Sequence, residues 1–205
     1  MKKIKILEKK NRPWVIAHRG YRSAFPENTI SAFEAAIQVK ADMIELDVCL
    51  SRDRIPVVIH DKTLDRTTDG KGLVADFSLS ELKELDAGSW FKKEFKGEKI
   101  PTLEETLDKM GGRISINIEI KPESFEISKP FDAIEIQVCN LVERFKMEDE
   151  VIISSFEHLF FGRIQNYYKE NNKLNSLRIA PLQDIFLKKK SILAICMREK
   201  AYSFH

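Results

Sequence analysis

The sequence predicts an α/β fold built on a parallel β-sheet. Three short apolar runs rich in β-branched residues, V-I-A-H-R-G, M-I-E-L-D-V and V-V-I-H-D, are each bounded by turn residues. Runs of this kind are typical of strands buried on both faces, as in a parallel sheet. Between the first two runs, Ile30, Phe33 and Ile37 have the spacing of an amphipathic helix, with Asn28 as its expected N-cap and Thr29 beside it. Strand, helix and strand then form one βαβ unit.

The end of each run carries side chains suited to phosphate and metal chemistry. They are His18 and Arg19, Glu45 and Asp47, and His60 and Asp61. The carboxyl ends of parallel strands meet at one rim, where α/β folds bind their ligands. We therefore expect these groups to share one rim. Asp61 either orients His60 or begins the turn that follows.

Three carboxylates at this rim predict a metal site. Glu45 and Asp47 are two residues apart, so the alternation of a strand points both to the same side. A fourth run, I-S-I-N-I-E-I-K, ends in Glu119 and Lys121 with the same spacing. Ca²⁺ and Mg²⁺ prefer such oxygen ligands, and Arg19 and Lys121 would neutralise a phosphate beside the ion. The alternative is that Glu119 and Lys121 form a surface ion pair.

A long excursion, about residues 62–100, follows the third run. Two capping boxes predict helices in it and directly after it: Ser78-x-x-Glu81 and Thr102-x-x-Glu105, the second opening a helix that ends near Gly111. Trp90, Phe91 and Phe95 lie among lysines in the same excursion. They form either a lid over the substrate or a small satellite core under a long loop.

The C-terminal half continues the alternation of strands and helices. The runs at 151–156 and 177–182 predict a fifth and a sixth strand separated by a helix. His158 falls in that helical pattern and is expected on the helix surface, with no role in the site. A further helix over about 183–200 and the start of a seventh strand at 201–205 complete the prediction.

Composition indicates one soluble globular domain. The 205 residues are 43% hydrophobic and 32% charged, with a net charge of +2, and no basic stripe favours nucleic-acid binding. No apolar run reaches the ~18 residues of a membrane span, and no signal peptide is evident. Cys49, Cys139 and Cys196 lack paired spacing. This pattern predicts a reducing compartment, and hence a cytoplasmic protein.

Taken together, H-R-G-x-x-x-x-x-P-E-N-T, E-x-D-V, H-D and E-I-K resemble the motifs of the glycerophosphodiester phosphodiesterase family. The resemblance extends from His18 to about Leu182 and includes D-R-T-T-D-G-K-G, I-P-T-L-E-E and I-S-S-F. It implies a TIM (β/α)8-type barrel with an insertion after the third strand, at about 62–100, within a single domain spanning 1–205.

The resemblance also implies a function. Members hydrolyse glycerophosphodiesters to glycerol 3-phosphate and an alcohol with a divalent metal, here Ca²⁺ or Mg²⁺. Matched by position, the residues are Glu45, Asp47 and Glu119 for the metal, His18 and His60 as general acid and base, and Arg19 and Lys121 for the phosphate. Two histidines suit this reaction, because one proton must be removed and another donated near neutral pH. Direct attack by water and a cyclic phosphate intermediate both remain open.

The barrel is expected to be incomplete at its C-terminal side. A TIM barrel has eight strands and usually about 250 residues, whereas six to seven strands are predicted here. An open barrel exposes strand edges and apolar surface, which predicts reduced stability or self-association.

Other functions compatible with these residues are a lysophospholipase D-like activity, with the acyl chain beside Trp90, Phe91 and Phe95, and an inactive relative that binds a phosphate ligand or a membrane surface. A metallohydrolase acting on amides fits less well, because such enzymes commonly have a His-x-His pair on the first strand, and here His18 is followed by Arg19 and Gly20.

Overall fold

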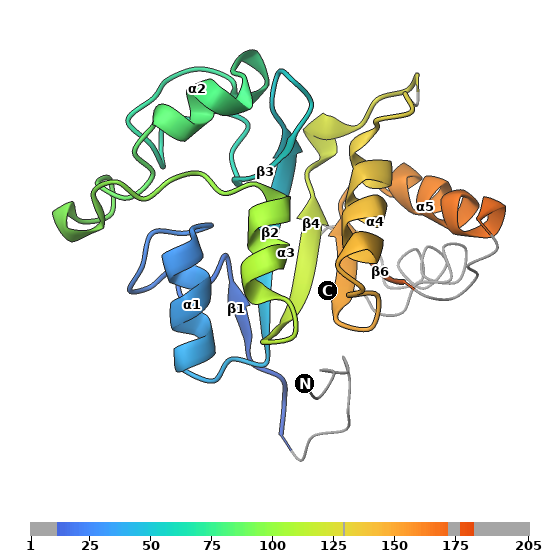
Figure 1. The fold of residues 1–205 in the computed structure, drawn as a ribbon, viewed down its shortest axis with the longest axis horizontal. Helices are drawn as coiled ribbons and strands as arrows, with labels where there is room; N and C mark the ends of the chain where they lie inside the picture. The colour runs from blue at the N-terminus through green and yellow to red at the C-terminus, as the bar shows by residue number, and fades with distance from the viewer. Residues whose placement is uncertain (1–11, 129, 172–176, 183–205) are drawn as a thin grey trace, which may run out of the picture.

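The computed structural model describes residues 12–128, 130–171 and 177–182, and these form an open, mainly parallel sheet covered by helices (Figure 1). Strand order is β1-β2-β4-β5-β6, with β3 paired to β2. The strands are β1 (Ile16–His18), β2 (Met43–Leu50), β3 (Pro56–Val58), β4 (Ser115–Ile120), β5 (Val151–Ser155) and β6 (Arg178–Pro181). The helices are α1 (Ile30–Gln38), α2 (Leu79–Glu84), α3 (Leu103–Met110), α4 (Ile134–Arg144) and α5 (Leu159–Glu170). The predicted α/β class is confirmed, as are the fifth and sixth strands.

The two faces of the sheet differ in chemistry because side chains alternate along each strand. On β2 and β4, one set of alternate residues joins the large core beneath the helices: Ile44, Leu46, Val48, Ile116, Ile118 and Ile120. Helices α1, α3 and α4 lie side by side along this face (Figure 1). The intervening residues of β2 and β4 point to the other face. They include the three carboxylates predicted to bind a metal, so burial of the helix-facing residues orients the site.

Strand register aligns the predicted site residues across the sheet. In the parallel pairing of β1 with β2, His18 lies opposite Glu45. Asp47 on β2 lies opposite Glu119 on β4. The main-chain hydrogen bonds of the sheet therefore bring together residues from three separate parts of the sequence.

The third apolar run is not a parallel strand, and that part of the prediction is wrong. Strand β3 runs antiparallel to β2, with Val58 opposite Val48. The connection, residues 51–55, is far shorter than the dozen or more residues that a parallel crossover needs. The backbone N–H of Ile59 donates to the carbonyl of Asp47 at 3.0 Å. The hairpin thus returns His60 to the level of the carboxylates.

Helix caps follow the predicted side chains with one exception. The side chain of Thr29 caps α1 by accepting from the N–H of Ala32, whereas Asn28 is not the cap. Asn28 has a φ of 57° and directs its amide toward β2 instead. Both capping boxes are formed, and α3 is followed by Gly111 as predicted.

The insertion between β3 and β4 has a small core of its own. Its buried members are Cys49, Val57, Ile59, Leu64, Val74, Leu82, Ala87 and Ile100. Beside it, the ring of Phe95 lies 5.8 Å from Phe91 and 5.3 Å from Phe25 of the loop before α1. None of Trp90, Phe91 and Phe95 is a buried member of that core, so both the lid and the satellite-core interpretations stay predictions.

Two predicted elements, the helix over 183–200 and the strand start at 201–205, lie outside the described residues, as does Cys196. His158 directly precedes α5 and is partly buried, with Nε2 2.9 Å from the carbonyl oxygen of Leu182. In the part of the chain that the structure describes, no helix is both long and apolar enough to cross a membrane.

Candidate active site

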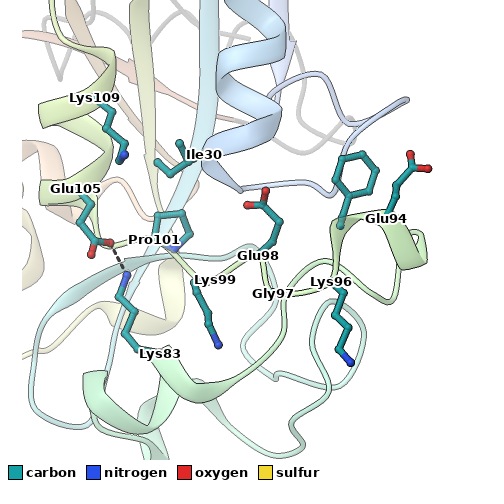
Figure 2. Close-up of a pocket in the computed structure, with 11 residues that line it drawn as sticks. Ile30, Lys83, Glu94, Lys96, Gly97, Glu98, Lys99, Pro101, Glu105 and Lys109 are labelled. Atoms are coloured by element: carbon teal, nitrogen blue, oxygen red, sulfur yellow. Dashed lines mark hydrogen bonds and ion pairs between the residues drawn. The ribbon is translucent and has the colours of Figure 1, made fainter.

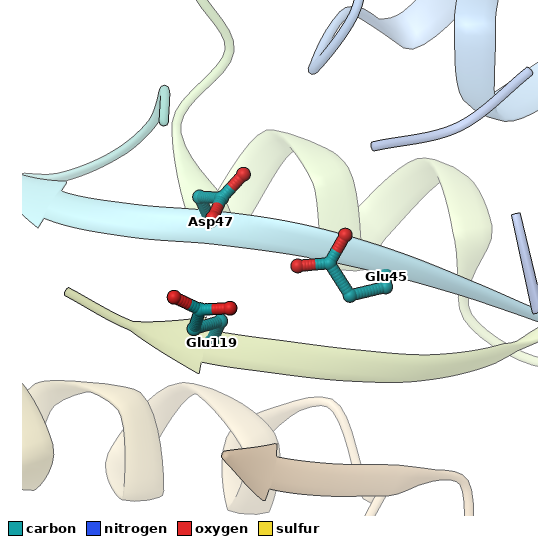
Figure 3. Close-up of side chains that lie close together, drawn as sticks. All are labelled: Glu45, Asp47 and Glu119. Carbon is teal, nitrogen blue, oxygen red and sulfur yellow. The ribbon is translucent and has the colours of Figure 1, made fainter. Parts of the chain in front are cut away.

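Glu45 and Asp47 of β2 and Glu119, near the carboxyl end of β4, form a compact, buried cluster of carboxylates (Figure 3). One oxygen atom from each residue lies within 4.8 Å of the other two. Their exposed fractions are 6%, 0% and 8%, respectively. Three negative groups at this spacing repel one another strongly when water is excluded. The cluster therefore requires positive charge nearby.

The electrostatics of the cluster match a divalent cation. Burial, and then the charge of Asp47, raise the pKa of Glu45 to about 8. Burial also raises the pKa of Glu119. The Oε1 atom of Glu45 is buried and has no hydrogen-bond partner among the described residues. Hard oxygen donors with an unsatisfied, buried lone pair fit Ca²⁺ or Mg²⁺, so the residues present suit the predicted metal.

Lys121 supplies one positive charge from within the protein. Its Nζ lies 2.9 Å from Oε1 of Glu119 and 3.5 Å from Oδ1 of Asp47. Burial lowers the pKa of this amine, but the two carboxylates outweigh that effect and raise it. Because Lys121 is only 8% exposed, the pair with Glu119 is a buried one and the surface-pair alternative is wrong.

Arg19 reaches the same cluster from the end of β1. Its backbone N–H donates to Oε2 of Glu45 at 2.9 Å, and its Nε lies 3.3 Å from Oδ2 of Asp47. The φ angles of Arg19 and Gly20 are 58° and 79°. A Cβ at Gly20 would lie 2.8 Å from atoms of Ala32, so only glycine allows α1 to pack this close to β1. This left-handed turn directs the Arg19 side chain and N–H toward the carboxylates.

His18 lies at the edge of the cluster. Its Nε2 is 3.7 Å from Oε2 of Glu45, and half of its side chain is exposed. Partial burial of the ring lowers the pKa of His18, and the positive charges of Arg19 and Arg22 lower it further. The imidazole is therefore accessible to a ligand.

His60 is held by the residue after it. Its Nδ1 lies 2.5 Å from Oδ1 of Asp61. A hydrogen bond from Arg66 lowers the pKa of Asp61 to about 2. Burial of the carboxyl opposes this shift, and the hydrogen bond with His60 adds to it. An ionised carboxylate only accepts hydrogen bonds, so Nδ1 of His60 carries a proton. Nε2 is left as the atom able to exchange a proton with a ligand. Of the two predicted roles for Asp61, the geometry favours orienting His60.

Three further residues hold the site, and sequence reasoning missed two of them, Asn28 and Arg66. Asn28 donates from Nδ2 to Oδ2 of Asp47 at 2.9 Å. Glu27 and Arg66 form ion pairs that connect Arg19 with Asp61. The sequence contains one signal for a second role of Asn28. Two candidate caps, Asn28 and Thr29, precede a single helix that needs only one cap, so the other side chain is available for a different contact. No local pattern identifies Arg66.

A cavity among the described residues lies elsewhere. Its volume is about 610 Å³, and Lys83, Phe95, Glu105 and Lys109 are among its lining residues (Figure 2). None of the predicted site residues lines it. Lysines and glutamates are mixed along its wall, and Lys83 already pairs with Glu105. This cavity is therefore separate from the carboxylate cluster.

Comparisons with known proteins agree with this geometry. Residues 18–189 match the model of the glycerophosphoryl diester phosphodiesterase family. The chain is 50% identical over 145 residues to a glycerophosphodiester phosphodiesterase of Caldanaerobacter subterraneus subsp. tengcongensis, covering 70% of this chain and 58% of that protein. It is 40% identical over 155 residues to one of Bacillus subtilis, covering 71% and 53%. The chain thus spans between half and three fifths of the length of these curated relatives.

Solved structures extend the likeness to the fold. An Oleispira antarctica phosphodiesterase in complex with the product sn-glycerol-3-phosphate has a TM-score of 0.81 and 31% identity, covering 94% of this chain and 74% of that one. A glycerophosphodiester phosphodiesterase from Agrobacterium tumefaciens has a TM-score of 0.77 and 34% identity, covering 94% and 75%. These neighbours confirm an incomplete TIM-barrel type of fold. On the family match and these identities, the chain belongs to the glycerophosphoryl diester phosphodiesterase family.

Proposed function

We propose that this chain carries the active site of a metal-dependent phosphodiesterase that hydrolyses glycerophosphodiesters to glycerol 3-phosphate and an alcohol. The observation that supports this most is the meeting of three buried carboxylates with two histidines and two cationic side chains at one rim. The substrate class is supported by the names of the relatives and by the glycerol phosphate bound in the Oleispira protein.

Glu45, Asp47 and Glu119 would hold the metal, because each offers a carboxylate oxygen within 4.8 Å of the others. A bound Ca²⁺ or Mg²⁺ would stabilise negative charge that develops on the phosphate oxygens. Arg19 and Lys121, which lie beside different oxygens of Asp47, would stabilise the same negative charge. Their preorganised charges favour a phosphate and the additional charge of its transition state.

His18 and His60 would transfer the two protons of the reaction. Asp61 holds Nδ1 of His60, so Nε2 exchanges the proton. His18 offers a half-exposed ring whose Nε2 lies 3.7 Å from Oε2 of Glu45. One histidine takes a proton from the attacking hydroxyl, and the other gives a proton to the departing alkoxide.

A second candidate function is that of a lysophospholipase D-like enzyme using the same site. The observation that favours it is a row of aromatic rings that begins near Arg19. Tyr21, Phe25 and Phe95 are neighbours at centroid distances of 6.2 and 5.3 Å, and Phe91 and Trp90 continue the row. Trp90 is 37% exposed. An acyl chain could lie along such a surface.

Location and partners belong to the same proposal. A small-molecule substrate is supported by the product bound in the Oleispira protein. A reducing, cytoplasmic location is supported by Cys49 and Cys139, which are buried, free thiols. Self-association through the outer edge of β1 is supported by the exposed apolar side chains of Val15 and Ile16.

The purified 205-residue chain should release glycerol 3-phosphate from glycerophosphocholine in the presence of Mg²⁺ or Ca²⁺, and chelation should stop the release. Glu119→Gln should remove the activity, whereas the exposed Glu104→Gln is the matched control. Metal-independent release, or an active Glu119→Gln, would contradict the proposal. Faster cleavage of lysophosphatidylcholine than of glycerophosphocholine would favour the second candidate.

A further inference from the structure

Arg66, in the insertion, forms two forked ion pairs with residues next to the proposed site. Its Nε and Nη2 donate to the carboxylate of Asp61 at 2.6 and 3.1 Å. Its Nη1 and Nη2 donate to the carboxylate of Glu27 at 3.0 and 2.7 Å. A planar guanidinium that donates to two carboxylates in this way fixes their positions relative to each other.

Each of these carboxylates continues to a residue of the site. Asp61 contacts Nδ1 of His60 at 2.5 Å. Glu27 accepts from Nη1 of Arg19 at 3.0 Å, and Arg19 in turn reaches Asp47. Arg66 therefore lies at the centre of an unbroken chain of charged contacts. The chain joins the proposed acid or base, His60, to the proposed phosphate ligand, Arg19.

The two ends of this chain belong to different structural elements. His60 and Asp61 follow β3, whereas Arg19 and Glu27 lie in the loop between β1 and α1. His60 lies beyond the paired residues of the hairpin, so sheet register does not orient its ring. Side-chain contacts must do so, and Arg66 bridges both loops.

The charges around Arg66 are consistent with a fixed arrangement. Its hydrogen bond is the first cause of the low pKa of Asp61. Burial raises the pKa of Glu27, but Arg66 and Arg19 together lower it. The Glu27 side chain is only 9% exposed and the Arg66 side chain 43%. Loss of Arg66 would leave a buried carboxylate with one partner instead of two, free to pull Arg19 away from Asp47.

We propose that Arg66 is a positioning residue, which holds the Asp61–His60 pair and the Glu27–Arg19 pair at the separation that places a bound phosphate in front of Nε2 of His60. The inference rests on the proposed function and assigns a role to the insertion. Arg66 itself touches neither substrate nor metal and acts only through Asp61 and Glu27.

The test compares Arg66→Met and Arg66→Lys with Arg113→Met. Arg113 is a matched control, because it forms a forked pair with Glu34 at 2.6 Å for both nitrogens and is 41% exposed, yet lies before β4 at the opposite end of the sheet. We expect Arg66→Met to lower kcat about 10- to 100-fold, the effect usual for outer residues that orient a site. Arg66→Lys should recover only part of this, because an ammonium cannot form two forks. Arg113→Met should leave kcat unchanged, and it should lower Tm by about as much as Arg66→Met does.

A second measurement does not depend on turnover. Ring ¹⁵N chemical shifts of His60 report which nitrogen carries the proton in the neutral ring. The wild-type chain should show the Nδ1–H form, and Arg66→Met should show a mixture with the Nε2–H form, because Asp61 is no longer held. Arg113→Met should resemble the wild type.

The two measurements separate the two proposals. A wild-type chain without turnover on any glycerophosphodiester would contradict the proposed function, while the His60 spectra would still decide the role of Arg66. Identical His60 spectra in wild type and Arg66→Met would overturn the positioning role. So would an Arg66→Met variant with a lowered Tm and an unchanged kcat, since Arg66 would then only fasten the insertion.

Discussion

The parallel sheet and the insertion place their site residues by different means. Glu45, Asp47 and Glu119 are aligned by the register of β2 and β4, whose helix-facing side chains belong to the large core. His60 and Arg66 lie on loops beside a much smaller apolar cluster, where side-chain ion pairs define their positions. Residues placed by register need no side-chain partner for alignment, whereas residues on loops do. The proposed metal ligands and the proposed proton-transfer group should therefore respond differently to mutation.

The largest expected effect is a loss of turnover without a loss of stability. His60→Ala should lower turnover of glycerophosphocholine by about 10²- to 10⁴-fold, the usual contribution of a general acid or base. The free energy of unfolding should change little, because His60 is outside both apolar clusters. Steady-state kinetics and denaturant titration measure the two quantities. His158→Ala is the control, and full activity in His60→Ala would refute the proposed role.

Truncating one buried side chain in each core tests whether the sheet and the insertion unfold separately. Ile118 and Leu82 are both fully buried, one in the sheet core and one in the insertion. Ile118→Ala should lower the free energy of unfolding by about 2–5 kcal/mol for the whole domain. Leu82→Ala should mainly promote local opening of the insertion, seen as faster amide exchange within residues 62–100 and reduced turnover. Equal exchange throughout the Leu82→Ala domain would show that the insertion is not a separate unit.

Metal binding should stabilise the sheet region selectively. Saturating Mg²⁺ or Ca²⁺ would relieve repulsion among the carboxylates, adding about 2.7 kcal/mol at a hundred times Kd. Thermal unfolding with and without the ion measures this. Glu45→Gln removes one of the mutually repelling charges and one ligand, so it should abolish the response to metal. An unchanged response in Glu45→Gln would place the ion elsewhere.

The smallest expected effect concerns the insertion at low pH. Burial opposes ionisation of Asp86, but hydrogen bonds from the backbone N–H groups of Ser89, Gly88 and Gly97 hold the pKa of its carboxyl well below the usual range. A lowered pKa stabilises the folded state above about pH 4, and the contribution is lost as pH falls below that value. Asp86→Asn should cost on the order of 1 kcal/mol at pH 7, because solvent screens this carboxyl.

The pH dependence provides the check on Asp86. The difference in free energy of unfolding between wild type and Asp86→Asn should shrink steadily in titrations below pH 4. Asp108→Asn, on the exposed side of α3, is the control. A difference that is constant from pH 7 to pH 3 would assign the effect to packing and not to charge.

Much of the site followed from local pattern. The spacing of Glu45 and Asp47 in a buried strand predicts that both carboxylates share a face, and the repeat at Glu119 and Lys121 predicts a second strand of the same design. Both predictions are confirmed. They succeed because a strand alternates its side chains whatever its neighbours are. The predictions of both capping boxes are also confirmed, because a capping box depends only on residues within one turn of the helix.

The orientation of the third run and the role of Asn28 were predicted wrongly. An apolar run shows burial but not direction, and the direction of β3 depended on the short connection after β2. Asn28 and Thr29 are equally good caps in isolation. Asn28 instead adopts a positive φ and donates to Asp47, nineteen residues away in sequence. Contacts of that range leave no periodic signal.

The amino-acid sequence alone determined the α/β class, the two capping boxes and the carboxylates, because each depends on residues within one turn or one strand. Only the tertiary structure decided that β3 folds back as a hairpin, that Lys121 is buried between Asp47 and Glu119, and that Arg66 joins His60 to Arg19. These features depend on the registers and loop paths that bring distant segments together. The free energy that selects them comes from packing the whole core, which no short stretch of sequence encodes.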